Sequence, residues 1–132
     1  MKKPSKPFDV ICPPLPKFSD DRGEIQTLLE GIPFSSVLRI TSCKGAIRAN
    51  HYHKEDYHYC ILESGRMEYY ERPVGDTGAP TCVTIHPGQV FYTRSMVEHA
   101  MKFIEDSVFW CFSRNSRAQA NYESDTVRVK LI

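Results

Sequence analysis

The sequence lacks a long apolar run, a charge surplus and a secretory signal. None of its apolar runs approaches the roughly 20 residues that a membrane-spanning helix needs, so we expect no membrane association. Its 17 basic and 16 acidic side chains give a net charge of +1, and nucleic-acid binding as a main role requires a basic surplus. The N-terminal residues are basic but have no continuous apolar stretch behind them, so no secretory signal is expected.

Paired cysteine motifs are also missing. The five cysteines are an odd number and none of them forms a CxxC pair: Cys12, Cys43, Cys60, Cys82 and Cys111. We therefore expect reduced, mostly buried thiols in a cytoplasmic protein rather than a disulfide framework or a cysteine-based zinc site.

The N-terminal segment differs in composition from the remainder. Five of the nine prolines fall before Lys17. Because proline fixes φ and removes a hydrogen-bond donor, residues 1–20 are expected to form an extended arm without a helix, lying on the domain or crossing to a second subunit. Residues 21–132 are expected to form one domain.

A long helical period is absent, and short β-type segments recur instead. About ten of them are separated by turn residues at a spacing of roughly 8–12 residues. The expected strands cover residues 24–29, 36–42, 46–53, 57–62, 66–71, 81–86, 90–93, 99–104, 107–113 and 125–131. This pattern predicts an all-β fold, as an antiparallel sandwich or jelly roll.

Four of the five histidines form a pattern that suits metal binding. His51 and His53 are two residues apart, so on a strand both side chains leave the same face. His58 follows after a short charged turn, and His99 lies far downstream. Neutral imidazole is the commonest protein ligand for borderline transition metals. The spacing therefore predicts a metal site inside a small β-barrel.

These residues resemble the cupin family. The first cupin motif is G-x5-H-x-H-x3-4-E-x6-G, and Gly45, His51, His53, His58 and Gly65 reproduce its spacing, with His58 where the family usually has Glu. The second motif is matched only by its first glycine, Gly88, and its histidine, His99; the family's Pro, Gly and Asn are replaced by Arg94, Met96 and Phe103. The resemblance implies the cupin double-stranded β-helix, a jelly-roll barrel.

The segment around Arg48 is similar to the nucleotide-sugar branch of these barrels. Asp21-Arg22-Gly23 precedes a strand, and Arg48-Ala-Asn-His-Tyr-His-Lys54 approaches the R-G-x-H-x-H-K string of the dTDP-sugar 3,4-ketoisomerases. Ala49 stands where those enzymes have glycine. By this resemblance, His51 is similar to the catalytic base of the 3,5-epimerases, and Arg48 to an arginine that contacts phosphate.

The expected cofactor is one divalent transition metal held by His51, His53, His58 and His99. Four neutral imidazoles leave the ion open among zinc, iron, nickel and manganese. The alternative is a metal-free pocket in which the same histidines act as acid and base. No residue is assigned as the general base, since His51 cannot be a ligand and a base at once.

Three further residues are candidates for substrate binding. Arg48 stands three positions before His51, so strict alternation places it on the other face of the strand as a surface residue; the other interpretation is a contact to a substrate phosphate or carboxylate. Tyr57 and Tyr92 are candidates for hydrogen bonds to a ligand, and the alternative for both is a core or rim aromatic.

The main functional hypothesis is a metal-dependent isomerase or epimerase that acts on a sugar or nucleotide-sugar next to a carbonyl. Two alternatives are a metal-dependent dioxygenase and a non-catalytic cupin that binds a small ligand. The N-terminal arm and the exposed strand edges of such a fold favour a homodimer.

Overall fold

The computed structural model describes residues 10–132, and the first nine residues of the expected N-terminal arm lie outside this range. The described part of the chain contains eleven strands and one short helix, which confirms the predicted all-β class. No helix in this range has the length and apolar character that a membrane crossing needs.

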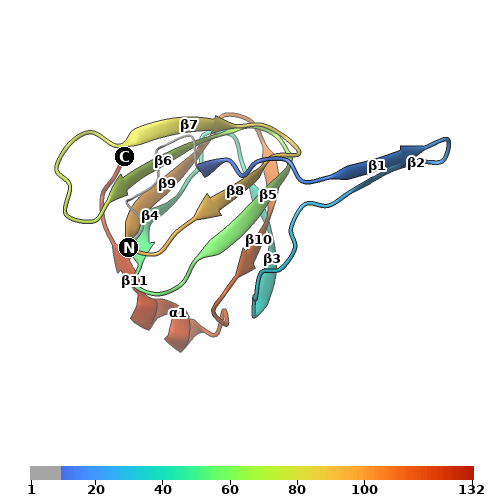
Figure 1. Ribbon diagram of the computed structural model, residues 1–132. Coiled ribbons are helices and arrows are strands. Elements are labelled where there is room, and N and C mark those ends of the chain that lie inside the picture. Colours follow the sequence, from blue (N-terminus) through green and yellow to red (C-terminus); the bar gives the residue numbers. More distant parts are fainter. Residues whose placement is uncertain (1–9) are drawn as a thin grey trace.

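The barrel consists of two antiparallel sheets that face each other (Figure 1). The first sheet has the strand order β3 (Ser36–Ser42), β10 (Ser107–Ser113), β5 (His58–Ser64) and β8 (Val90–Thr93). The second has the order β11 (Thr126–Arg128), β4 (Ile47–His53), β9 (Val97–Phe103), β6 (Met67–Pro73) and β7 (Thr81–Ile85). Neighbours in each sheet are mostly distant in sequence, which is the pattern of a jelly roll.

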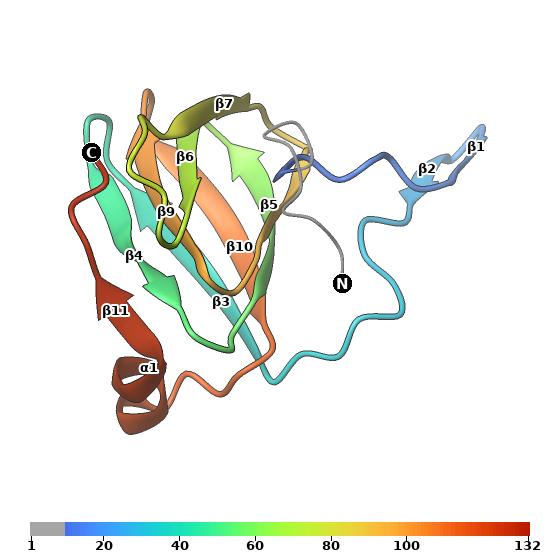
Figure 2. The same ribbon diagram turned by 60° about the vertical axis from the view of Figure 1, so that its left-hand side comes forward.

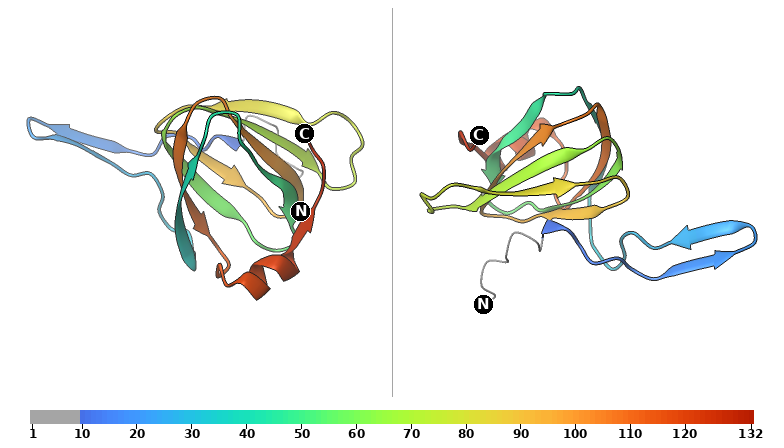
Figure 3. Two further views of the ribbon diagram at one scale, coloured as in Figure 1. Left: turned by 180° about the vertical axis from the view of Figure 1, so that it is seen from behind. Right: turned by 90° about the horizontal axis from the view of Figure 1, so that it is seen from above.

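A separate hairpin projects from the barrel, as Figure 2 and both views of Figure 3 show. It pairs β1 (Lys17–Asp20) with β2 (Gly23–Gln26), so the boundary expected after residue 20 falls in its turn. Before the hairpin, Val10 is fully buried and the Cys12 amide donates to the Val90 carbonyl at 2.8 Å. The described part of the proline-rich segment is therefore anchored on the barrel.

The interior between the sheets is apolar at one end and polar at the other. Alternating residues of the strands point inward and form the core, and its largest buried members are Tyr69, Phe91, Phe103, Phe109, Leu62, Met67 and Ile85. The helix α1 (Gln119–Asp125) lies beside β11 at the end where β4 and β9 carry their histidines (Figure 1). Hydrophobic burial thus holds the sheets together and leaves one end for polar side chains.

Candidate functional site

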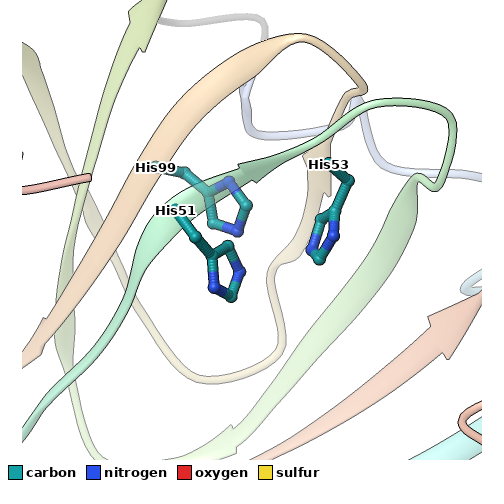
Figure 4. A group of neighbouring side chains, drawn as sticks. All are labelled: His51, His53 and His99. Carbon is teal, nitrogen blue, oxygen red and sulfur yellow. The ribbon is translucent and has the colours of Figure 1, made fainter. Parts of the chain in front are cut away.

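Three histidines converge inside the polar end of the barrel. His51 and His53 project from β4, and His99 projects from β9 directly opposite His51. Their ring nitrogens come within 4.8 Å of one another. Figure 4 shows the three rings turned into one region between the strands. His51 and His53 therefore leave the same face of β4, as their two-residue spacing predicted.

Hydrogen bonds to two of these rings define which nitrogen carries the proton. Nδ1 of His99 lies 3.3 Å from the Val97 carbonyl oxygen, which only accepts, so Nδ1 is the protonated atom. The Thr126 hydroxyl donates to the Tyr122 carbonyl, so it accepts from Nδ1 of His53 at 3.3 Å. In both rings Nε2 keeps a free lone pair, which is the form of histidine that binds a metal.

Burial keeps these imidazoles neutral. Desolvation first, and then the neighbouring imidazoles, lower the pKa of His51 to about 3 and that of His53 to about 4. Full burial also holds the pKa of His99 well below its ordinary value. All three rings are therefore uncharged at neutral pH and offer lone pairs without having to lose a proton.

Two of the nitrogens have no hydrogen-bond partner. Nδ1 of His51 and Nε2 of His53 are buried and unpaired. A buried polar atom without a partner costs about 1–3 kcal/mol, so such atoms mark a site that another group completes. A divalent transition ion fits the three histidines, because it would accept the lone pairs that the protein leaves unused.

His58 lies beside this group but its ring is bonded elsewhere. It stacks on His53 with ring centroids 4.8 Å apart. Its Nε2 lies 2.9 Å from Asp56 Oδ2 and its Nδ1 lies 3.1 Å from the sulfur of Cys111. Burial alone would lower its pKa, but the bonds to Asp56 and Cys111 outweigh burial and raise the pKa to about 9. The structure therefore brings three of the four predicted ligands together and gives the fourth two other partners.

Arg48 lies on the same face as His51, contrary to strict alternation. Ala49 and Asn50 have φ of 70° and 55°, and the register of β4 against β9 shifts between Ala49 and His51. This β-bulge leaves Asn50 without a cross-strand partner and resets the alternation. Arg48 is therefore exposed, as expected, but it stands on the pocket side of the strand and lines the histidine pocket, with Nε donating to Ser42 Oγ at 2.7 Å.

His51, His99 and the neighbouring His58 line a cavity of about 130 Å³. Its polar wall includes His51, His58, His99, Arg48, Arg117 and Tyr122. The guanidinium of Arg117 lies 3.7 Å from the centre of the Tyr122 ring. Pockets for drug-sized ligands have volumes of roughly 300–1,000 Å³, so this cavity suits the reacting end of a ligand whose anionic part stays near the arginines.

Tyr57 and Tyr92 lie outside this pocket. Tyr92 pairs with Tyr59 across β5 and β8, and the inward positions beside them are Cys60 and Phe91. The rings of Tyr59 and Tyr92 stack at 4.5 Å, and Tyr57 packs at 6.0 and 6.1 Å from them. These tyrosines form an aromatic cluster on the outer face of the sheet, away from the histidines.

Sequence reasoning missed several residues that build the pocket. Arg117 and Tyr122 belong to the polar segment after β10, where no helix was expected, and α1 indeed has no side-chain N-cap. Asp56 was placed in a charged turn, and Cys111 among the buried thiols. Nothing in the sequence around Asp56 or Cys111 indicates that the pairing of β5 with β10 would bring these two residues to the same place.

No protein-family model and no curated protein sequence matches the chain. Solved structures do match. A sugar 3,4-ketoisomerase from Thermoanaerobacterium thermosaccharolyticum, in complex with TDP, superposes with a TM-score of 0.69 and 20% identity over 87% of this chain and 84% of that one. A 3′-monoepimerase from Streptomyces bikiniensis, in complex with dTDP-quinovose, gives a TM-score of 0.68 and 19% identity over 81% of this chain and 64% of that one.

A capsular polysaccharide assembling protein from Staphylococcus aureus also matches. Its TM-score is 0.66 at 19% identity, over 89% of this chain and 34% of that one, so this chain corresponds to about a third of it. Identities this low establish the fold and leave activity open. The chain has the cupin jelly-roll fold, in the form also found in nucleotide-sugar ketoisomerases and epimerases.

Proposed function

We propose that this protein is a metal-binding cupin enzyme that isomerises or epimerises a sugar or nucleotide-sugar next to a carbonyl group. The observation that carries the proposal is a group of three neutral, buried histidines, two of which have an unpaired nitrogen, beside a pocket that two arginines line. The ketoisomerase solved with TDP and the epimerase solved with dTDP-quinovose support the nucleotide-sugar class of substrate.

The proposed ligands of the metal are His51, His53 and His99. When bound, a divalent zinc, iron, nickel or manganese ion would polarise a substrate carbonyl and so acidify the adjacent C–H bond. Thr126 and the Val97 carbonyl orient His53 and His99 through their Nδ1 atoms.

The arginines would orient the substrate. Arg48 is fixed by Ser42 Oγ at 2.7 Å and by the Thr41 carbonyl at 2.9 Å, and Arg117 is held over the Tyr122 ring. A guanidinium presents several N–H donors in a planar fork that matches the oxygens of a phosphate. Both arginines would bind the phosphates of a nucleotide-sugar while α1 and its preceding loop limit the access of water to the pocket.

The proposal is tested with TDP-4-keto-6-deoxyglucose in deuterated water. Proton NMR should show deuterium replacing hydrogen at the carbon beside the carbonyl, together with a shifted carbonyl or an inverted centre, because both reactions pass through loss of that proton. Oxygen consumption is recorded in the same reaction. If no deuterium entered any keto-sugar tried, the proposal would be contradicted. Oxygen uptake coupled to turnover would favour a dioxygenase.

We further propose that the chain acts as a homodimer in the cytoplasm. The hairpin exposes Phe18 and Ile25, which are directly opposite each other and 58% and 69% exposed. Isolated two-stranded ribbons with an apolar pair are stable only when another surface covers them. All five cysteines are unpaired and Cys43 and Cys82 are exposed, which suits a reducing compartment.

Placing aspartate at both apolar hairpin positions, Phe18→Asp with Ile25→Asp, is expected to convert a dimer into a monomer. Two charges would be desolvated at the contact without partners, which costs several kcal/mol. Light scattering after size exclusion should then fall from about twice the 15.2 kDa chain mass to that mass. The matched control replaces the Lys17–Glu24 ion pair of the same hairpin with serines and should stay dimeric. Equal masses for the wild type and both variants would show that the hairpin does not form the dimer interface.

A further inference from the structure

A cysteine, a histidine and an aspartate form a hydrogen-bonded series beside the pocket. The sulfur of Cys111 lies 3.1 Å from His58 Nδ1, and His58 Nε2 lies 2.9 Å from Asp56 Oδ2. Nε2–H donates to the carboxylate, because an ionised carboxylate only accepts. That bond directs the second ring nitrogen at the thiol. A nucleophile, a base and a group that orients the base are the parts of a nucleophilic centre.

Strand pairing fixes two members of this series, and backbone amides fix the third. Cys111 on β10 stands opposite Cys60 on β5, and two positions further along Ser113 stands opposite His58. Asp56 is held from the other side, since its Oδ1 accepts the backbone amides of Tyr57 at 2.9 Å and Asn115 at 3.0 Å. The geometry therefore comes from the sheet and from backbone donors, which is the rigid support that reactive side chains need.

The thiol faces the cavity that the histidines line. Cys111 and His58 both belong to the cavity wall, as does His51, whose buried Nδ1 lacks a partner. Asp56 and Cys111 are only 5% and 4% exposed, so bulk water is kept from them. Cys43 and Cys82, in contrast, are exposed, and neither shows a histidine partner among the hydrogen bonds of the described residues. The cavity thus holds a thiol with a partner for its proton next to an incompletely satisfied polar wall.

We propose that Cys111 is the nucleophile of a second reactive centre, which adds to the carbonyl carbon of a small aldehyde or ketone in the cavity. In this addition the Sγ–C bond forms while the C=O π bond breaks. The thiol proton, shared between Sγ and His58 Nδ1, passes to the carbonyl oxygen, so the product is a thiohemiacetal. Nothing is oxidised or reduced and no other reactant is needed. His58 acts on the nucleophile, and Asp56 is a positioning residue.

This proposal needs neither the metal nor the sugar substrate, so its failure would leave the proposed isomerase untouched. The contacts of the sulfur support it: Cys111 Sγ lies 3.1 Å from His58 Nδ1 and 3.5 Å from Ser113 Oγ. A ring nitrogen is therefore in place to hold the thiol proton as the sulfur attacks.

The first experiment measures alkylation of the full chain by iodoacetamide, with each cysteine followed by mass spectrometry of its peptide. Cys111 is expected to react about ten times faster than the exposed Cys43 and Cys82, although it is buried. His58→Gln and Asp56→Asn should each lower the Cys111 rate by at least about tenfold and leave the Cys43 and Cys82 rates unchanged. Cys60, which is 1% exposed, should stay unlabelled and so reports that each variant is folded.

The second experiment tests the addition itself with propionaldehyde labelled by ¹³C at its carbonyl carbon. With the wild-type protein, a ¹³C signal should appear in the sp³ region of the NMR spectrum in addition to the signal of the aldehyde hydrate. Cys111→Ser should abolish this additional signal. Two results would overturn the proposal: a Cys111 alkylation rate no greater than that of Cys43, or equal rates in wild type, His58→Gln and Asp56→Asn while Cys60 remains protected. The same spectrum from wild type and Cys111→Ser would also overturn it.

Discussion

Replacing His99 with alanine is expected to weaken transition-metal binding by more than about 100-fold, because loss of an outer-sphere partner alone costs about 10–100-fold. His99 is 1% exposed and meets His51 across the β4–β9 ladder. Alanine would leave a two-histidine site, because both ring nitrogens of the neighbouring His58 already have partners. The measurement is the metal content of protein that was never exposed to chelators, followed by competition with a chelator of known affinity.

Two other histidines supply the controls. His86 is exposed in a turn, and its alanine variant should keep the wild-type metal content. His58→Gln separates the predicted four-histidine site from the three-histidine arrangement, since both nitrogens of His58 are already bonded to Asp56 and Cys111. We expect His58→Gln to weaken binding by less than about tenfold. A loss as large as that of His99→Ala would make His58 a fourth ligand, and wild-type protein without metal would refute the site.

The strands and the histidine group were readable from the sequence because local rules govern both. Alternating side chains and turn residues located Ser36–Ser42, Val90–Thr93 and Ser107–Ser113 to the residue. The two-residue spacing of His51 and His53 fixed a common strand face without knowledge of the partner strand. His99 is too distant for strand spacing to place it beside the other two, and the family resemblance added support for that connection.

Local rules fail where the backbone departs from regular geometry. Ala49 and Asn50 adopt left-handed φ values, which residues other than glycine rarely adopt. The sequence therefore gives no reason to predict this conformation here. The resulting bulge turns Arg48 to the pocket side of the strand, although the residue stays exposed. A glycine at position 49, as in the family string, would have carried the signal. A residue with positive φ next to a binding pocket is a frequent sign of function.

Contacts across long sequence separations were equally hidden. His58 and Cys111 are 53 residues apart and meet only because β5 pairs with β10 in one particular register. The carboxylate of Asp125, at the end of α1, accepts the amides of Glu55 and Asp56 and so ties the helix to the β4–β5 turn. Neither contact follows from a periodic pattern, because pairing order in a jelly roll is set by the whole chain.

The replacement of Gly65 by alanine is expected to lower the free energy of unfolding by about 3 kcal/mol or more. Gly65 has a φ of +93°, which costs an L-residue about 1–2 kcal/mol. A Cβ atom there would also lie 2.5 Å from the Asp106 carbonyl oxygen and 2.7 Å from Ser107 Cα. Both are backbone atoms of the turn that leads into β10, so relief requires the β5–β6 and β9–β10 turns to separate, which costs a further 1–3 kcal/mol or so.

Gly45→Ala isolates the steric part of this effect. Gly45 has a similar φ of +86°, but nothing lies within 4 Å of the position of its Cβ. Its substitution should therefore cost only the backbone strain of about 1–2 kcal/mol. Urea unfolding of the three proteins at one protein concentration gives the comparison, because a dimer's stability depends on concentration. If Gly65→Ala were no more destabilising than Gly45→Ala, the close approach of the two turns would be wrong. A larger loss of stability in Gly65→Ala would show that Gly65 is needed for packing between the two turns, because Gly45 and Gly65 share the same backbone conformation.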